Sequence, residues 1–287
     1  MSKKSEIMLC PTCAVPNNIT DVVLGDDELP SWLLKRNYVD EFINSQNKFK
    51  EYMPKNPTET LMIDVGKKNA GRYILFWAAD TKTSAIVKDA KKAYKIFDNH
   101  GVTKVDAHGH AKVCIRCPQV YCTTPAKGKK AYTYNKHMHF CVSNKQNNKW
   151  LGEKVYTRMV VCNLGFKVFE NARNEGKSVI INALSCEYYG KDHIPNSWNL
   201  TSKAAKKIST KDLASWFKGL LVHYPKLHKL VESGKIKIMN IPIIIYCAHK
   251  DCNASNMLAE VLLKKGFRNI DEYPGGMKEW NNMHKKC

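Results

Sequence analysis

A cysteine at the end of an apolar run is the residue of this sequence best placed for chemistry. The segment Ile243–Ser255 reads IIIYCAHKDCNAS, so the β-branched run stops at Cys247 and a polar loop leads into a helix-like run at Asn256–Lys265. A buried strand of a parallel sheet is typically followed by a helix in this way. We expect Cys247 to lie where loop amides and the helix N-terminus converge, which lowers the pKa of a thiol. The sequence therefore predicts a nucleophile, the alternative being a half-buried cysteine without chemistry.

The loop that follows supplies the other candidate residues of this site. His249 and Lys250 could attract an anionic substrate, or could simply be solvated loop residues. Cys252 lies five residues after Cys247, so it could close a small disulfide or accept sulfur if the two Cα atoms come within roughly 7 Å. The alternative is a small residue that lines the loop. The expected substrate-binding loop comprises Ala248, His249, Lys250, Asp251, Cys252 and Asn253.

The elements that must position this loop alternate between strand and helix after about residue 160. Such alternation predicts a parallel sheet flanked by helices, an α/β domain that we place at residues 156–287. The expected strands are Ser178–Ala183, Ile241–Tyr246 and Asn269–Tyr273, and the expected helices are Phe166–Glu175, Lys211–His223 with Thr210 as its cap, and Met257–Lys265.

The first part of the chain has a different pattern, which predicts an α+β domain with antiparallel strands at residues 1–155. Two segments, Val102–Asp106 and Ala111–Arg116, flank a His-Gly-His turn and predict a hairpin. The other expected elements are helices at Trp32–Lys48 and Ser84–Asn99 and strands at Arg72–Ala79, Lys136–Val142 and Val155–Val161.

Three patches of the second domain resemble one known family. They are His193-Ile194-Pro195 with Asn199-Leu200, then Tyr246-Cys247 with its loop and helix, and then Gly266-Phe267-Arg268-Asn269-Ile270 followed by Gly275-Gly276-Met277-Lys278-Glu279-Trp280. Their order and spacing resemble a rhodanese-type sulfurtransferase domain. The resemblance implies a rhodanese-like α/β fold and an enzyme that moves sulfane sulfur, from thiosulfate or a persulfide to a thiol or cyanide, through a persulfide on Cys247. It implies no cofactor for this transfer.

The sequence departs from the usual pattern of that family at several positions. Asn182 and Leu184 stand where the family normally has aspartate and arginine, and the loop after Cys247 is slightly long and lacks an arginine. A phosphatase relative would need that arginine for bidentate phosphate contacts, so we do not expect a phosphatase. Two alternatives remain open: a non-catalytic binding module for a protein or nucleic acid, and a thiol redox switch formed by Cys247 and Cys252.

Two groups of residues in the first domain have the spacing of metal ligands. Cys10 with Cys13 and Cys114 with Cys117 form two CxxC pairs, which could hold one Zn²⁺ if the fold brings them together. His137 and His139 would project from one face of a strand, together with Cys141, as zinc or iron ligands. The alternatives are unligated thiols and ordinary polar residues. We recognise no family for this domain.

Composition limits the cellular setting and the partners of this protein. No apolar run reaches the length of a membrane span, and the N-terminus lacks a secretory apolar stretch, so we expect a soluble cytoplasmic protein without a membrane partner. Its 11 cysteines are then expected as free thiols, ligands or catalysts. The formal charge of +20 could serve an acidic or nucleic-acid partner. However, only six of the 46 basic residues are arginine, and the lysines are spread along the chain, which favours a compositional origin.

Overall fold

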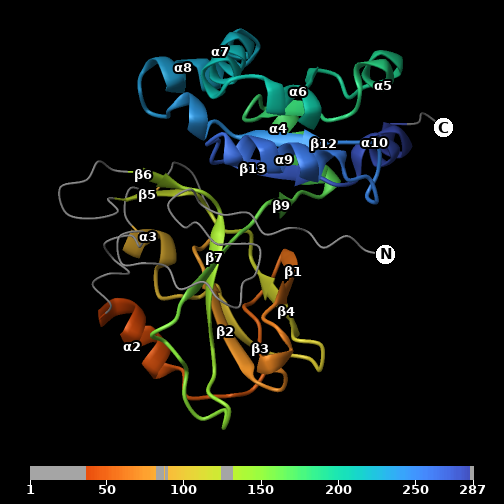
Figure 1. Cartoon of the computed structure of the whole chain (residues 1–287). Helices are drawn as coiled ribbons and strands as arrows, with labels where there is room; N and C mark the ends of the chain where they lie inside the picture. Colours follow the sequence, from red (N-terminus) through yellow and green to blue (C-terminus); the bar gives the residue numbers. More distant parts are fainter. Residues whose placement is uncertain (1–36, 82–86, 88–89, 124–131, 285–287) are drawn as a thin grey trace. The chain divides into compact units, whose positions relative to one another are not determined.

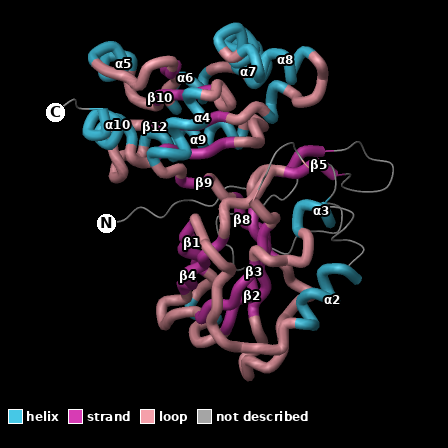
Figure 2. The backbone as a smooth tube through the Cα atoms, turned by 180° about the vertical axis from the view of Figure 1, so that it is seen from behind, coloured by secondary structure: helices cyan, strands magenta, loops and turns pink. Residues whose placement is uncertain are grey.

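A computed structural model describes residues 37–81, 87, 90–123 and 132–284 of the 287-residue chain (Figure 1). The chain divides into two compact units, Met1–Val160 and Val161–Cys287. Strands and loops make up most of the first unit, whereas helices are prominent in the second (Figure 2). Among the described residues, no helix is both long and apolar enough to span a bilayer.

The first unit contains antiparallel sheets and few helices, as the α+β prediction requires. A four-stranded sheet has the order β3-β2-β7-β8, and two smaller sheets pair β1 with β4 and β5 with β6. The described elements are α2 (Asn37–Ser45), β1 (Glu59–Asp64), η3 (Lys67–Asn69), β2 (Tyr73–Ala78), α3 (Ala90–Tyr94), β3 (His100–Lys104), β4 (His110–Ile115), β5 (Tyr121–Thr123), β6 (Tyr132–Tyr134), β7 (His137–Val142) and β8 (Tyr156–Met159).

Two predictions for this unit were wrong. The helix expected over Ser84–Asn99 is only the short α3 in the part of the chain that is described, because Lys95 and Phe97 adopt positive φ values of 48° and 61°, which a helix cannot accommodate. The expected hairpin does not form either. The turn is closed by a hydrogen bond from the Asp106 N–H to the His110 carbonyl, but β3 then pairs with β2 and β4 with β1.

The second unit has the parallel α/β architecture that the sequence predicts. Its five-stranded parallel sheet has the order β11-β10-β12-β13-β9. The elements are β9 (Cys162–Asn163), α4 (Phe166–Asn174), β10 (Val179–Asn182), α5 (Cys186–Lys191), β11 (Ser197–Asn199), α6 (Ser202–Lys207), α7 (Thr210–Leu220), η4 (Leu221–His223), α8 (Pro225–Glu232), η5 (Ile238–Asn240), β12 (Ile243–Tyr246), α9 (Ala254–Lys264), β13 (Ile270–Tyr273) and α10 (Gly276–His284). The cap of α7 is Ser209 and not Thr210, since the Ser209 hydroxyl accepts from the Asp212 N–H.

Successive side chains of the central strands point to opposite faces of the sheet, and each face forms a separate core with the helices that cover it. Ile244 and Tyr246 of β12 pack with Tyr273 of β13, Phe169 of α4 and Trp280 of α10, so α4 and α10 cover one face of the sheet. The opposite face is the one on which α9 contacts β12 and β13.

The buried stripe of α9 has the i, i+3, i+4, i+7 spacing of an amphipathic helix. Its residues are Ser255, Leu258, Ala259 and Leu262. A serine therefore begins the stripe that faces the sheet, next to the loop that joins β12 to α9.

Candidate active site

Cys247 directly follows the last residue of β12, and residues 248–253 connect it to α9. The predicted order of strand, loop and helix is confirmed here. Cys247 has the same parity as Ile243 and Ile245, whose side chains point away from the α4 and α10 face. Because Ile245 pairs with Glu272 of the parallel strand β13, the side chains of Cys247 and Glu272 lie on the same face, toward α9.

The thiol of Cys247 is enclosed by its own loop and by the start of α9. Its Sγ lies 3.0 Å from the Ser255 Oγ, 3.4 Å from the Cys252 carbonyl oxygen and 3.8 Å from the His249 carbonyl oxygen. Only 1% of Cys247 is exposed. The loop therefore presents two carbonyl oxygens to the sulfur, where the sequence predicted converging amides.

The electrostatic prediction for this thiol was also wrong in direction. Burial raises the pKa of Cys247 to about 11, and the thiol of Cys252 adds to the increase. Interactions with the side chain and the backbone of Ser255 act in the opposite direction. Desolvation penalises the thiolate more strongly than the first turn of α9 stabilises it. In its resting state the site therefore holds a neutral thiol at pH 7.

A buried hydroxyl and a buried carboxylate continue the site behind Cys247. The Ser255 Oγ donates to the Glu272 Oε1 at 2.5 Å, and the Asn256 Nδ2 donates to the same oxygen at 3.4 Å. Ser255 is fully buried and Glu272 is 6% exposed. Burial raises the pKa of Glu272, while the hydrogen bond from Ser255 lowers it.

Sequence reasoning missed both of these residues, although each left a signal. Glu272 is an acidic residue inside an expected strand of a parallel sheet flanked by helices, where an acidic side chain needs a partner. Ser255 lies three residues before Leu258 on the apolar stripe of α9, which places its hydroxyl against the sheet.

The expected substrate-binding loop consists mostly of exposed residues. His249, Lys250, Asp251 and Asn253 are exposed, whereas Ala248 and Cys252 are partly buried. A backbone hydrogen bond of 2.9 Å from the Cys252 N–H to the His249 carbonyl tightens the loop. Cys252 is a free thiol, and it raises the pKa of Cys247.

The histidine patch and the unusual Asn182 fix the fold around this loop. Tyr246 directly precedes Cys247 in the sequence. Its hydroxyl lies 2.8 Å from the Ser197 Oγ and accepts a hydrogen bond of 3.0 Å from the Ile194 N–H. The Asn182 Oδ1 accepts from the Leu184 N–H at 2.8 Å and so closes the turn after β10. The His193 ring stacks on Tyr189 with centroids 4.1 Å apart. These contacts give Asn182 and His193 structural roles.

The histidine pair of β7 lies in the aromatic core of the first unit. The His137 Nε2 lies 3.2 Å from the Tyr94 hydroxyl and 3.1 Å from the Tyr121 hydroxyl, and its Nδ1 lies 2.6 Å from the Asn135 carbonyl. The His139 Nδ1 lies 2.7 Å from the Thr157 Oγ1, and the two imidazole centroids are 4.8 Å apart. Both rings share one face with buried Cys141, as expected, but protein groups occupy both nitrogens of His137.

The CxxC pair at the end of β4 is fixed by contacts of Arg116, the residue between Ile115 and Cys117. The Arg116 N–H donates to the Asn99 Oδ1, and the Arg116 guanidinium pairs with Asp80 at 3.0 Å. The Cys117 Sγ and a carboxylate oxygen of Glu59 on β1 lie within 4.8 Å of each other. Glu59 is thus a candidate ligand that the sequence did not reveal.

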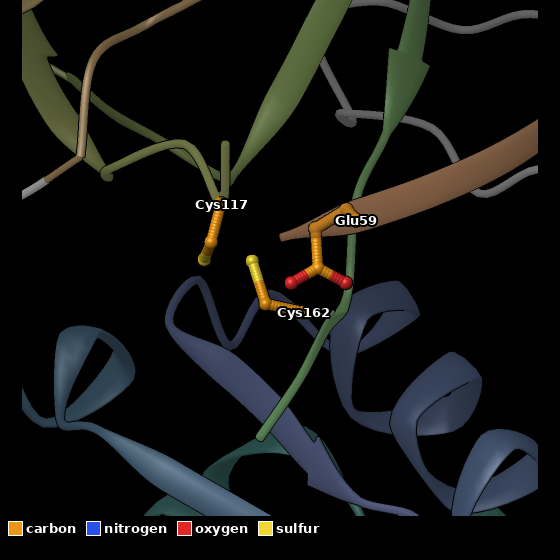
Figure 3. A group of neighbouring side chains, drawn as sticks. All are labelled: Glu59, Cys117 and Cys162. Atoms are coloured by element: carbon orange, nitrogen blue, oxygen red, sulfur yellow. The ribbon is translucent and has the colours of Figure 1, made fainter. Parts of the chain in front are cut away.

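The remaining members of the predicted zinc set are less informative. Cys10 and Cys13 lie outside the described residues. Cys114 is a free thiol on β4, with its Sγ 3.7 Å from the Thr60 Oγ1. Figure 3 shows Cys117 and Glu59 of the first unit; Cys162, also drawn there, belongs to β9 of the second unit.

Comparison with known proteins assigns a family to one part of the chain. The family model described as "Rhodanese-like domain" matches residues 166–283. No curated protein matches the chain.

Several solved structures resemble less than half of the chain. A human single-domain sulfurtransferase has 11% identity and a TM-score of 0.30, covering 44% of this chain and 97% of its own. A single-domain sulfurtransferase from Saccharomyces cerevisiae has 15% identity and a TM-score of 0.28, covering 40% and 87%. An uncharacterised protein from the same yeast has 18% identity and a TM-score of 0.31, covering 43% and 93%. The first part of the chain carries no family assignment, and residues 166–283 are a rhodanese-like domain, as the sequence patches predicted.

Proposed function

We propose that the rhodanese-like domain transfers sulfane sulfur through a persulfide on Cys247. The observation that carries this proposal is the position of the thiol, at the carboxyl end of β12 and 3.0 Å from the hydroxyl of Ser255 at the start of α9. The side chain and the backbone of Ser255 both lower the pKa of Cys247 and so favour an anion on the sulfur, whether thiolate or persulfide.

The transfer consists of two displacements that balance without a cofactor. The Cys247 thiolate attacks the outer sulfur of thiosulfate, the S–S bond of the donor breaks, and sulfite leaves with the bonding electron pair. A thiolate or cyanide acceptor then attacks the terminal sulfur of the persulfide and releases the Cys247 thiolate. Charge is conserved in both steps, and the cysteine returns to its original oxidation state.

The exposed loop determines which donors can approach. Lys250 is exposed on it and supplies a point charge for an anionic donor, but no arginine offers a bidentate fork. We therefore infer that a protein persulfide or a small-molecule persulfide suits the loop better than thiosulfate does. The first unit, which we regard as a separate domain, would present the acceptor, an acidic partner or a metal.

Intact mass spectrometry tests this proposal directly. Full-length protein incubated with thiosulfate or glutathione persulfide should gain about 32 Da, the mass of one sulfur atom. The adduct should disappear with cyanide and should be absent in Cys247→Ser. Cys186→Ser is the matched control, because Cys186 is an exposed free thiol on α5 and its loss should change nothing. No adduct with any sulfane donor would exclude sulfur transfer and leave a non-catalytic binding module.

A thiol redox switch is the second candidate function of the same loop. The observation that favours it is the proximity of two free thiols on one loop, since the Cys247 Sγ lies 3.4 Å from the Cys252 carbonyl oxygen. Oxidation would join the two sulfur atoms, with two protons and two electrons passing to a peroxide or disulfide oxidant. This reaction would block the nucleophile reversibly.

A further inference from the structure

A hydrogen-bonded chain of three buried side chains connects the nucleophile to a carboxylate. The Cys247 Sγ lies 3.0 Å from the Ser255 Oγ, which lies 2.5 Å from the Glu272 Oε1. Each residue is on a different element: the end of β12, the first turn of α9 and the middle of β13. The register of β12 against β13 and the apolar stripe of α9 hold the three groups together.

Sulfur transfer requires a thiolate, and the hydrogen-bonded side chains of Ser255 and Glu272 can help to form it. A thiol with a pKa of about 11 is ionised in only roughly one molecule in ten thousand at pH 7. Since the thiolate is the nucleophile, the thiol needs a nearby proton acceptor. A carboxylate with a raised pKa that is reached through one hydroxyl has the properties of such a group.

We propose that Glu272 is a positioning and proton-accepting residue that activates Cys247 through Ser255. This proposal rests on the sulfur-transfer function above. The S–H proton of Cys247 passes to the Ser255 Oγ, while the hydroxyl proton of Ser255 passes to the Glu272 Oε1. One S–H and one O–H bond break, two O–H bonds form, and the negative charge moves from the carboxylate to the sulfur. Ser255 ends the step as a donor to the thiolate.

The Cys247 thiol and the Glu272 carboxyl group then share a single negative charge over a range of pH. Burial opposes a state in which the thiol and the carboxyl group are both ionised. One proton is therefore shared between these two groups until the pH is high. Within that range, the fraction of thiolate is set by the partition of this proton between sulfur and carboxylate. The reactivity of Cys247 should therefore be nearly independent of pH around neutrality, unlike that of an isolated thiol.

The other ionisable groups near this chain come from four elements. The loop carries Cys252, whose thiol raises the pKa of Cys247, and exposed His249, Lys250 and Asp251. On β13, Asp271 has the opposite parity to Glu272, and Tyr273 lies in the core on the other face, where Glu279 of α10 and Glu170 of α4 act on it. Lys278 of α10 approaches through its backbone N–H. None of these groups is a hydrogen-bond partner of the Glu272 carboxylate among the described residues.

Alkylation of Cys247 measures this proton transfer without requiring sulfur transfer. The rate at which iodoacetamide modifies the Cys247 peptide in full-length protein is followed by mass spectrometry between pH 5 and pH 11. We expect the rate in wild type to reach a plateau around neutral pH. In Glu272→Gln it should fall about tenfold per pH unit below the thiol pKa, and at pH 7 it should be at least tenfold slower than in wild type.

Ser255 and a distant glutamate supply the matched variants. Ser255→Ala should lose the plateau as Glu272→Gln does, and Ser255→Thr should keep it because the hydroxyl remains. Glu232→Gln should match wild type, since Glu232 is exposed on α8 and pairs with Lys218 and His228. Hydrogen exchange of the β12, β13 and α9 peptides checks that each variant is folded.

The opposite results would overturn the proposal in a recognisable way. If Glu272 only repels the thiolate, Glu272→Gln will alkylate at the same rate as wild type or faster. A wild-type rate without a plateau would equally exclude the relay, even if the persulfide forms. A plateau that depends on Glu272 and Ser255, but without any persulfide, would support the relay and refute sulfur transfer.

Discussion

The α-carbon of Gly276 lies so close to the carbonyl of Cys247 that a Cβ built on it would stand 2.3 Å from that oxygen. This approach lets the Met277 N–H donate to the Cys247 carbonyl at 3.0 Å and the Lys278 N–H donate to the Ala248 carbonyl at 2.9 Å. The φ value of Gly276 is 56°, in the left-handed region that favours glycine. Gly276, the first residue of α10, thus lets the backbone of this helix hold the backbone of the nucleophile in place.

Replacing Gly276 with alanine should therefore disturb both the fold and the site. We expect Gly276→Ala to destabilise the rhodanese-like unit by about 2 kcal/mol or more, since a positive φ and a backbone clash act together. Hydrogen exchange of the β12 and α10 peptides across a urea series measures this unit separately. Gly219→Ala is the matched control: nothing lies within 4 Å of its added Cβ, and alanine in α7 should be neutral or stabilising. Equal stability of the two variants would contradict the proposed anchoring.

The redox candidate makes a prediction about the number of thiols. Treatment of the folded protein with a mild oxidant should consume two thiols and link the peptides that contain Cys247 and Cys252. Thiol titration measures the loss, and mass spectrometry of a non-reduced digest identifies the pair. The reverse reaction with dithiothreitol should restore both thiols.

Single replacements distinguish this disulfide from unrelated oxidation. Cys252→Ser should abolish the linked peptide and leave Cys247 open to persulfide formation, whereas Cys186→Ser should not affect the link. A linked peptide that joins Cys247 to any other cysteine would refute the switch. An unchanged loss of two thiols in Cys252→Ser would do the same.

The CxxC pair of the first unit predicts bound zinc in the full-length protein. Cys117 is disulfide-bonded in the structure, so the protein must be purified with a reductant; it should then contain about one equivalent of zinc by elemental analysis if Cys114 and Cys117 are ligands. Replacing both Cys114 and Cys117 with serine should abolish the zinc content, and Glu59→Gln should reduce it. Cys122→Ser is the control and should leave the zinc content unchanged. Less than about a tenth of an equivalent in wild type would leave no support for a structural site.

The sequence predicted the strand, loop and helix around Cys247 because local patterns determine them. A β-branched run, a polar loop and an amphipathic run are visible without tertiary information, and β12 and α9 follow those patterns closely. The same holds for β2, β7 and β13. The hairpin failed because the pairing of β3 with β2 and of β4 with β1 is a long-range property that the turn does not determine.

The electrostatics of the site could not be predicted from local patterns. The pKa of Cys247 depends on its burial and on the direction in which the loop turns its carbonyl oxygens, and neither is encoded in the spacing of residues. The hydrogen-bonded connection from Cys247 to Glu272 depends on the register of the parallel strands β12 and β13. The sequence alone does not determine which residues of two strands pair. The positions of Ser255 and Glu272 became informative only once that register was known.

A histidine in the core of the first unit should make that unit sensitive to acid. His137 is buried on β7, where its imidazole contacts the hydroxyls of Tyr94 and Tyr121. Burial lowers the pKa of His137 to about 4, although the hydrogen bond with the Asn135 carbonyl acts in the opposite direction. The folded unit thus prefers the neutral imidazole, while the unfolded chain binds a proton near pH 6.5.

The stability that comes from this difference should be present above pH 6.5 and should be lost as the pH falls toward 4. Its size is about 3 kcal/mol, because the unfolded state binds one more proton over that interval. His137→Gln should weaken the pH dependence of unfolding between pH 6.5 and pH 4, as measured by hydrogen exchange of the β2 and β7 peptides, and buried His139, whose pKa is also lowered, should account for what remains. His108→Gln, at an exposed turn, should leave it unchanged. A wild-type unit that is equally stable at pH 4 and pH 7 would show that His137 accepts its proton without unfolding.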